Sequence, residues 1–158
     1  ITAKGEYMTN YSLISKEIEA LTSDVSDLIA NLSNVSALLN TELTDINWVG
    51  FYLLKDDKLI LGPFQGKPAC VTISLGKGVC GTAVSTDSLQ LVKDVHTFPG
   101  HIACDSASNS EIVLPLHDKT GKVVAVLDID SPTLGRFSEA DGEGILLLQP
   151  VLEDIFNR

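Results

Sequence analysis

Residues 111–132 read EIVLPLHDKTGKVVAVLDIDSP, and this stretch decides the fold of the chain. Two apolar runs, 111–116 and 122–130, stand on either side of HDKTG, whose polar residues and glycine are typical of a turn. Valine, isoleucine and leucine dominate both runs, which predicts two antiparallel strands joined as a hairpin. Pro115 lies inside the first run, so we expect that this strand is not central in its sheet throughout.

A second hairpin is predicted upstream, in residues 46–64. There INWVGFYLLKDDKLILGPF places aromatic and branched residues before and after a polar turn at residues 55–58. A third short strand, residues 70–75, leads into GKGVCGTAVST, where three closely spaced glycines predict a tight turn into a short helix. We expect residues 88–95 and the stretch around Pro99 to be irregular, as a long loop that serves function.

Helices are predicted at both ends of the chain. Apolar residues recur at helical spacing in residues 12–21 and again in residues 26–43. Near the C-terminus, Ser138 and Asp141 form a capping pattern before a last amphipathic helix. Helices at both ends around a set of hairpins indicate an α+β domain with a central antiparallel sheet.

Composition excludes several classes of function. The 158 residues suffice for one domain, and no run approaches the roughly 18 to 20 consecutive apolar residues that a membrane span requires. A formal charge of −10 would repel a phosphate backbone, so we expect no nucleic-acid partner. No secretion signal is recognisable, which favours the cytosol. We expect residues 1–7 to be an added leader, with the domain spanning residues 8–158.

Cys70, Cys80 and Cys104 allow three interpretations. Core packing is the ordinary one, but all three lie in the glycine-rich and polar middle of the chain rather than on an apolar helix face, and polar residues follow Cys104 directly. A zinc site with His101 would usually take its cysteines in close pairs, and nine residues separate Cys70 from Cys80. Thiol chemistry on a peroxide or sulfoxide needs one accessible cysteine and a second to resolve its sulfenic acid.

Carboxylates and aromatic residues accompany the cysteines. Glu111 begins one predicted strand, while Asp128 and Asp130 share a face of the next because they are two residues apart. They would be a solvated strand end or, given their apolar neighbours, partly desolvated acids of raised pKa. Trp48 and Tyr52 also share a strand face, either as core or as a small box beside the acids.

The sequence resembles a known enzyme family in three segments: GKPACVTISLGKGVCGTAV (66–84), PGHIACDSASNSEIVLPL (99–116) and VLDIDSP (126–132). It is similar to the free methionine-(R)-sulfoxide reductases, which are built on a GAF domain. The resemblance implies a central antiparallel sheet with the terminal helices packed on one face and a loop-built pocket on the other. It also implies the substrate, free L-methionine (R)-sulfoxide.

Carried over residue by residue, the resemblance implies that Cys104 is the nucleophile, Cys70 the main resolving cysteine and Cys80 an accessory thiol. Cys104 would become a sulfenic acid, condense with Cys70 to a disulfide, and be restored by thioredoxin. We expect no metal and no cofactor.

The resemblance also implies which residues bind the substrate. Glu111, Asp128 and Asp130 would hold the substrate and its sulfoxide oxygen, and Trp48 with Tyr52 would surround its methyl group. A homodimer through the outer helices is a further family-based expectation.

Two other function classes stay open at this stage. GAF domains also serve as non-catalytic sensors of small molecules, and a zinc-binding structural module is the other alternative. A sensor is normally joined to an output domain, and these 158 residues suffice for one domain, so we expect an enzyme.

Overall fold

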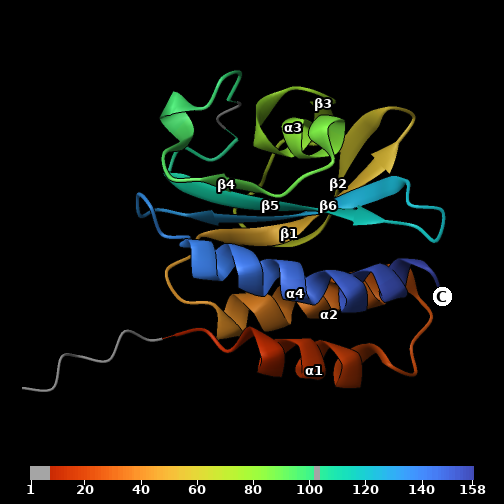
Figure 1. Ribbon diagram of the computed structural model, residues 1–158. Coiled ribbons are helices and arrows are strands. Elements are labelled where there is room, and N and C mark those ends of the chain that lie inside the picture. Colours follow the sequence, from red (N-terminus) through yellow and green to blue (C-terminus); the bar gives the residue numbers. More distant parts are fainter. Residues whose placement is uncertain (1–7, 102–103) are drawn as a thin grey trace, which may run out of the picture.

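One antiparallel sheet of six strands organises the chain, in the order β3-β2-β1-β6-β5-β4 (Figure 1). The computed structural model describes residues 8–101 and 104–158. The expected leader, residues 1–7, therefore lies outside the described residues, as do residues 102–103. The elements in chain order are α1 (Tyr11–Thr22), α2 (Leu28–Glu42), β1 (Trp48–Lys55), β2 (Lys58–Gly66), β3 (Thr72–Ser74), α3 (Gly78–Thr86), β4 (Gln90–Val92), the 3-10 helix η1 (Val95–Thr97), β5 (Ser110–His117), β6 (Val123–Ser131) and α4 (Glu139–Phe156).

Both predicted hairpins are confirmed. β5 pairs with β6 in a register that sets Glu111 opposite Asp130, and β1 pairs with β2 around a two-residue turn. That turn consists of Asp56 and Asp57, which both have positive φ, 48° and 62°. A turn with two positive φ values matches the right-handed twist of the strands that it joins.

The expectation of an irregular segment over residues 88–95 is wrong in part. Gln90–Val92 forms the edge strand β4, which pairs with β5 over Glu111–Val113, and a short 3-10 helix begins at Val95. Three residues are too few to show an alternating pattern in the sequence. Pro115, which has no N–H to donate, lies beyond the part of β5 that pairs with β4. At this residue β5 is therefore not paired with a strand on its β4 side, as expected.

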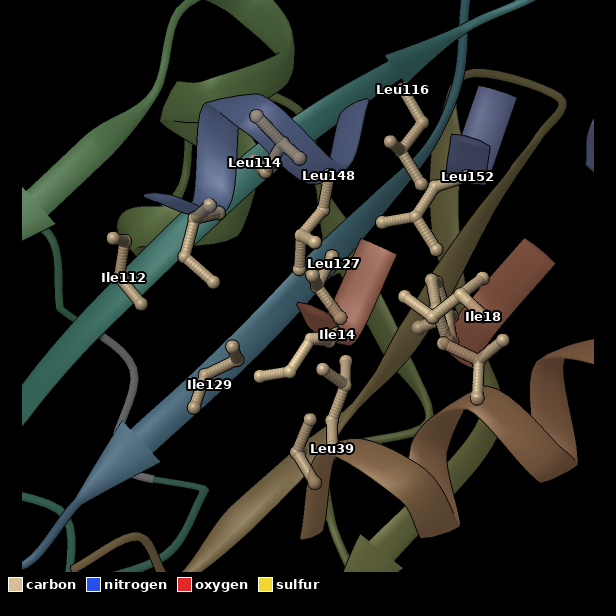
Figure 2. Packing of buried hydrophobic residues seen from close by; sticks show 14 of the residues in the cluster. Ile14, Ile18, Leu39, Ile112, Leu114, Leu116, Leu127, Ile129, Leu148 and Leu152 are labelled. Carbon is tan, nitrogen blue, oxygen red and sulfur yellow. The ribbon is translucent and has the colours of Figure 1, made fainter. Parts of the chain in front are cut away.

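The helix-facing side of the sheet carries the main core. α1, α2 and α4 cover this face, and α3 lies on the other (Figure 1). Figure 2 shows leucine and isoleucine side chains of β5 and β6 meeting those of the three helices. Because successive strand residues point to opposite faces, Ile112 and Leu114 join this core while Glu111 and Val113 face α3.

Close packing joins the first and last helices. Ser138 caps α4 in a reciprocal capping box with Asp141. Asp141 also accepts a hydrogen bond of 2.6 Å from the Tyr11 hydroxyl of α1. Gly144 lies under the Tyr11 ring, so the two helices approach closely. Within residues 8–101 and 104–158, no helix is both long and apolar enough to cross a membrane.

Candidate active site

A cavity with about 530 Å³ of empty space opens on the α3 side of the sheet. It is lined from β1, α3, the loop before β5, and the pocket-facing residues of β5 and β6. Of the site residues expected from the sequence, all except Cys70 line it. Cys70 joins them through a disulfide bond to Cys104. Tertiary structure therefore gathers the whole expected set.

Three carboxyl groups stand on the floor of the cavity. Strand alternation directs Glu111, Asp128 and Asp130 to the same face, and register sets Glu111 opposite Asp130 across the β5–β6 ladder. Glu111 is only 8% exposed and Asp128 only 5%. The acids therefore do not form a solvated strand end, which was one of the two interpretations of the sequence.

Burial raises the pKa of all three acids, and for Glu111 and Asp130 the negative charge of Asp128 raises the pKa further. Hydrogen bonds from Glu111 and the nearby Cys80 thiol to Asp128 oppose the rise in the pKa of Asp128. A Glu111 carboxyl that keeps its proton while Asp128 is ionised can act as an acid at neutral pH.

Cys70 and Cys104 form a disulfide that closes a separation of 34 residues, with their Cα atoms 5.4 Å apart. Both side chains are half-buried, and Cys104 lines the cavity. Zinc ligation by these two cysteines is therefore excluded in this oxidised form, because a thiolate is the ligand that zinc requires.

Cys80 corrects one expectation about the cysteines. It lies on the buried side of α3 and is 4% exposed, so it packs in the core, whereas we expected none of the three cysteines on an apolar helix face. Gly76 and Gly78 turn the chain at positive φ just before it, which carries Cys80 inward against the sheet. Its Sγ lies 4.0 Å from Glu111 Oε2, and burial, together with the charge of Asp128, raises the pKa of the thiol well above its usual range.

Aromatic side chains of β1 form one wall and also hold the Cys70 segment. Trp48 stacks on Tyr52, with ring centroids 5.9 Å apart, and on Phe64, with centroids 5.1 Å apart. The Trp48 indole N–H donates to the Lys67 carbonyl at 3.2 Å, and the Tyr52 hydroxyl donates to the Cys70 carbonyl at 2.8 Å. The aromatic pair therefore fixes the backbone on which Cys70 stands.

Sequence patterns missed the residue that anchors the Cys104 loop. The Asn47 side-chain amide donates to Asp105 Oδ2 at 3.0 Å and to Ser108 Oγ at 3.1 Å. Its backbone N–H donates to the Asp130 carbonyl at 2.9 Å. Asn47 thus ties the turn that follows Cys104 to the strand that carries the acids. Its place directly before Trp48 is the only signal that the sequence offers.

Two further lining residues add nitrogen groups. His101 stands at the cavity, and burial and the nearby His96 lower its pKa, which favours the neutral ring. Lys77 is the only lysine or arginine among the lining residues that the structure describes. It precedes the first turn of α3, where a helix favours negative charge.

Known proteins resemble the chain over nearly its whole length. The GAF domain family model matches residues 30–148. The free methionine-R-sulfoxide reductase of Escherichia coli (strain K12) is 54% identical over 145 residues, 92% of this chain and 87% of that protein. The reduced form of fRMsr of Staphylococcus aureus superposes with a TM-score of 0.90 at 54% identity, covering 94% of this chain and 96% of that one. Its complex with substrate superposes with a TM-score of 0.88 at 53% identity, with the same coverage.

Proposed function

The chain belongs to the GAF domain family, and since it is also 54% identical to a free methionine-R-sulfoxide reductase, we propose that it reduces free L-methionine (R)-sulfoxide to L-methionine. One observation carries the proposal: the Cys70–Cys104 disulfide stands at a cavity whose floor holds buried carboxyl groups. A disulfide beside an acid is what thiol reduction of a sulfoxide leaves behind.

The first step transfers the sulfoxide oxygen to the enzyme. Cys104, as the thiolate, attacks the substrate sulfur while Glu111 protonates the sulfoxide oxygen. The hydroxyl then moves from the substrate sulfur to Cys104 Sγ while the bond between the two sulfurs breaks, so methionine leaves and Cys104 is oxidised to the sulfenic acid. Glu111 suits the acid role because it is buried beside two other carboxyl groups, which keep its proton in place.

The second step regenerates the thiols. The Cys70 thiol condenses with the Cys104 sulfenic acid, water leaves, and the disulfide forms. Thioredoxin then reduces the disulfide, and its own two thiols are oxidised to a disulfide. Cys80 serves as an accessory thiol, and its high pKa suits this reserve role better than nucleophilic attack, which requires the thiolate.

Recognition of a free amino acid requires groups for both of its charges. Asp128 Oδ1 is buried and, within the described residues, has no hydrogen-bond partner, so it is free to receive the substrate ammonium. Lys77 lies at the same cavity and suits the carboxylate. Trp48 and Tyr52 surround the methyl group. A peptide-borne sulfoxide lacks both charges and is expected to be a poor substrate.

Substrate comparison tests the reaction. NADPH consumption coupled through thioredoxin and its reductase is measured with free (R)-sulfoxide, free (S)-sulfoxide and a peptide-borne sulfoxide. Only the first should support turnover. The reduced Cys70→Ser variant should still release about one methionine per enzyme but lose thioredoxin-driven turnover. Cys104→Ser should release none, and stoichiometric release by that variant would disprove the assignment of the nucleophile.

We also propose that the enzyme is a cytosolic homodimer. The cycle begins from reduced thiols, which the cytosol maintains. The outer helices carry exposed apolar side chains that a dimer would cover; these are Leu13 and Leu21 of α1, Ile29 of α2, and Leu146 and Leu147 of α4. Sedimentation should show a dimer for the wild type and a monomer for Leu147→Glu. A wild type that sediments as a monomer at micromolar concentration contradicts the dimer.

A further inference from the structure

The two sulfurs of the disulfide differ in what surrounds them. Cys104 lines the cavity, directly before Asp105, whereas Cys70 does not line it. A cavity of this kind, hollowed into one small domain, suits a small molecule and not a protein. A protein thiolate that approached Cys104 would also meet the charges of Asp105 and the buried acids. Cys70 lies outside the cavity, next to the exposed residues Val71 and Thr72.

The surface beside Cys70 is apolar at its centre. Val71 is 64% exposed, although it lies next to a disulfide and directly before the edge strand β3. Lys67, Pro68 and Thr72 are also exposed. We call residues 67, 68 and 70–72 the Cys70 face. The aromatic hydrogen bonds from Trp48 and Tyr52 hold its backbone from behind.

The segment that contains the Cys70 face differs in charge from the rest of the chain. Between Asp57 and Asp87 there is no acidic residue, although the chain has a net charge of −10. The same stretch holds three exposed lysines, which are Lys58, Lys67 and Lys77. An acidic partner is therefore attracted more to this stretch than to the acidic remainder of the chain.

We propose that the Cys70 face is the docking surface for the dithiol protein that reduces the enzyme, and that this protein attacks Cys70 rather than Cys104. The partner has apolar surface beside its thiols, which covers Val71, and acidic residues around it. This inference rests on the proposed function, since it names where the reductant of that cycle binds.

The electrons balance with the dithiol as the reductant. Its thiolate bonds to Cys70 Sγ, the Cys70–Cys104 bond breaks, and the electron pair leaves on Cys104 Sγ. The second thiol of the partner then attacks the partner's own sulfur in the mixed disulfide, which releases Cys70. The partner ends as a disulfide, and its two protons end on Cys70 and Cys104. Cys104 leaves as a thiolate before it takes up its proton, and it is free again at the cavity where the next substrate binds.

Trapping the mixed disulfide tests which sulfur is attacked. Thioredoxin whose second active-site cysteine is replaced by serine is mixed with the oxidised enzyme, and the digested complex is analysed by mass spectrometry. We expect the adduct on Cys70. An adduct on Cys104, or on neither cysteine, overturns the inference.

Steady-state kinetics test whether thioredoxin docks on the Cys70 face. Val71→Asp should raise the KM for thioredoxin about tenfold, while turnover supported by dithiothreitol stays within about twofold of the wild type. Leu134→Asp is the matched control, because Leu134 is 60% exposed and Gly135, next to it, bonds to Lys93 beside the opposite edge strand β4. The control should change neither value. Equal slowing of Val71→Asp with both reductants, or equal behaviour of the two variants with thioredoxin, contradicts the docking surface.

Charge reversal adds a second test of the surface. Lys67→Glu should weaken reduction by thioredoxin most at low salt, since the attraction is screened as ionic strength rises. An unchanged salt dependence counts against the charge complementarity. Failure of the proposed function would show separately, because the reduced enzyme would then release no methionine in a single turnover without any reductant.

Discussion

Replacing Glu111 by glutamine should lower activity and, at neutral pH, relieve an electrostatic cost of the folded state. Glutamine has nearly the shape of glutamic acid but cannot donate a proton to the sulfoxide oxygen. Loss of general acid catalysis typically costs 10²- to 10⁴-fold in rate. We therefore expect the single-turnover rate on free (R)-sulfoxide to fall at least about 10²-fold, which corresponds to about 2.7 kcal/mol of activation free energy.

Stability should change in the opposite sense as pH rises. The pKa of Glu111 is raised in the folded protein because of burial and the charge of Asp128. Its contribution to the free energy of unfolding is thus fully present below the ordinary pKa of glutamate, about 4.3, and is lost as pH rises through the folded value. Glutamine does not titrate. The melting temperature of Glu111→Gln, relative to the wild type, should therefore rise between about pH 4 and pH 8.

Rapid-quench release of methionine gives the rate, and thermal melts across this pH range give the stability. Asp130→Asn is the matched comparison, because Asp130 lies opposite Glu111 in the same ladder. A near wild-type rate for Glu111→Gln would move the acid to another group, first to Asp130. A melting difference that does not change with pH would show that Glu111 is not a desolvated carboxyl.

Three further predictions concern residues around the site and in the fold. Asn47→Ala should slow both methionine release and disulfide closure about tenfold in rapid-quench assays, because the Cys104 loop loses its anchor on Asp105; unchanged rates would show that the loop needs no anchor. His117 binds Asp87 and Glu153, and these hydrogen bonds raise the pKa of His117 by more than burial lowers it. The stabilisation from these contacts, roughly 1 kcal/mol, should therefore be present below pH 6.5 and be lost as pH rises above it. Denaturant titrations of His117→Gln should lack this pH dependence, and an identical profile to the wild type would refute it. A Cβ at Gly144 would overlap the Tyr11 ring, so Gly144→Ala should cost about 1 to 3 kcal/mol in denaturant titrations and leave methionine release unchanged. An unaltered midpoint would contradict the close packing.

Local patterns in the sequence were enough for most of the secondary structure. Helical spacing of apolar residues predicts α1 and α2 to within two residues, and the polar turns predict both hairpins. These features depend on neighbours along the chain, which is why they can be read without the fold. The sequence did not predict β4, because a three-residue edge strand is defined by its pairing with β5 rather than by its own residue pattern.

For the site too, the sequence predicted some features from local patterns and not others. Alternation along β1, β5 and β6 already places Trp48 with Tyr52, and Asp128 with Asp130, on shared strand faces. The roles of the three cysteines came from family resemblance, and their chemistry alone left core packing, zinc and redox open. Resemblance supplied the candidates, but no local rule predicts which thiols meet.

Only the tertiary structure decided how these groups stand toward one another. The sheet brings Glu111 within reach of Asp128 and buries both, which raises their pKa values, and it buries Cys80 of α3 beside Glu111. Pairing of Cys70 with Cys104, and the anchoring of the Cys104 loop by Asn47, join segments far apart in the chain. Periodicity along the chain reports which face a side chain takes, whereas burial, pKa and sulfur pairing depend on what the rest of the fold packs against that face.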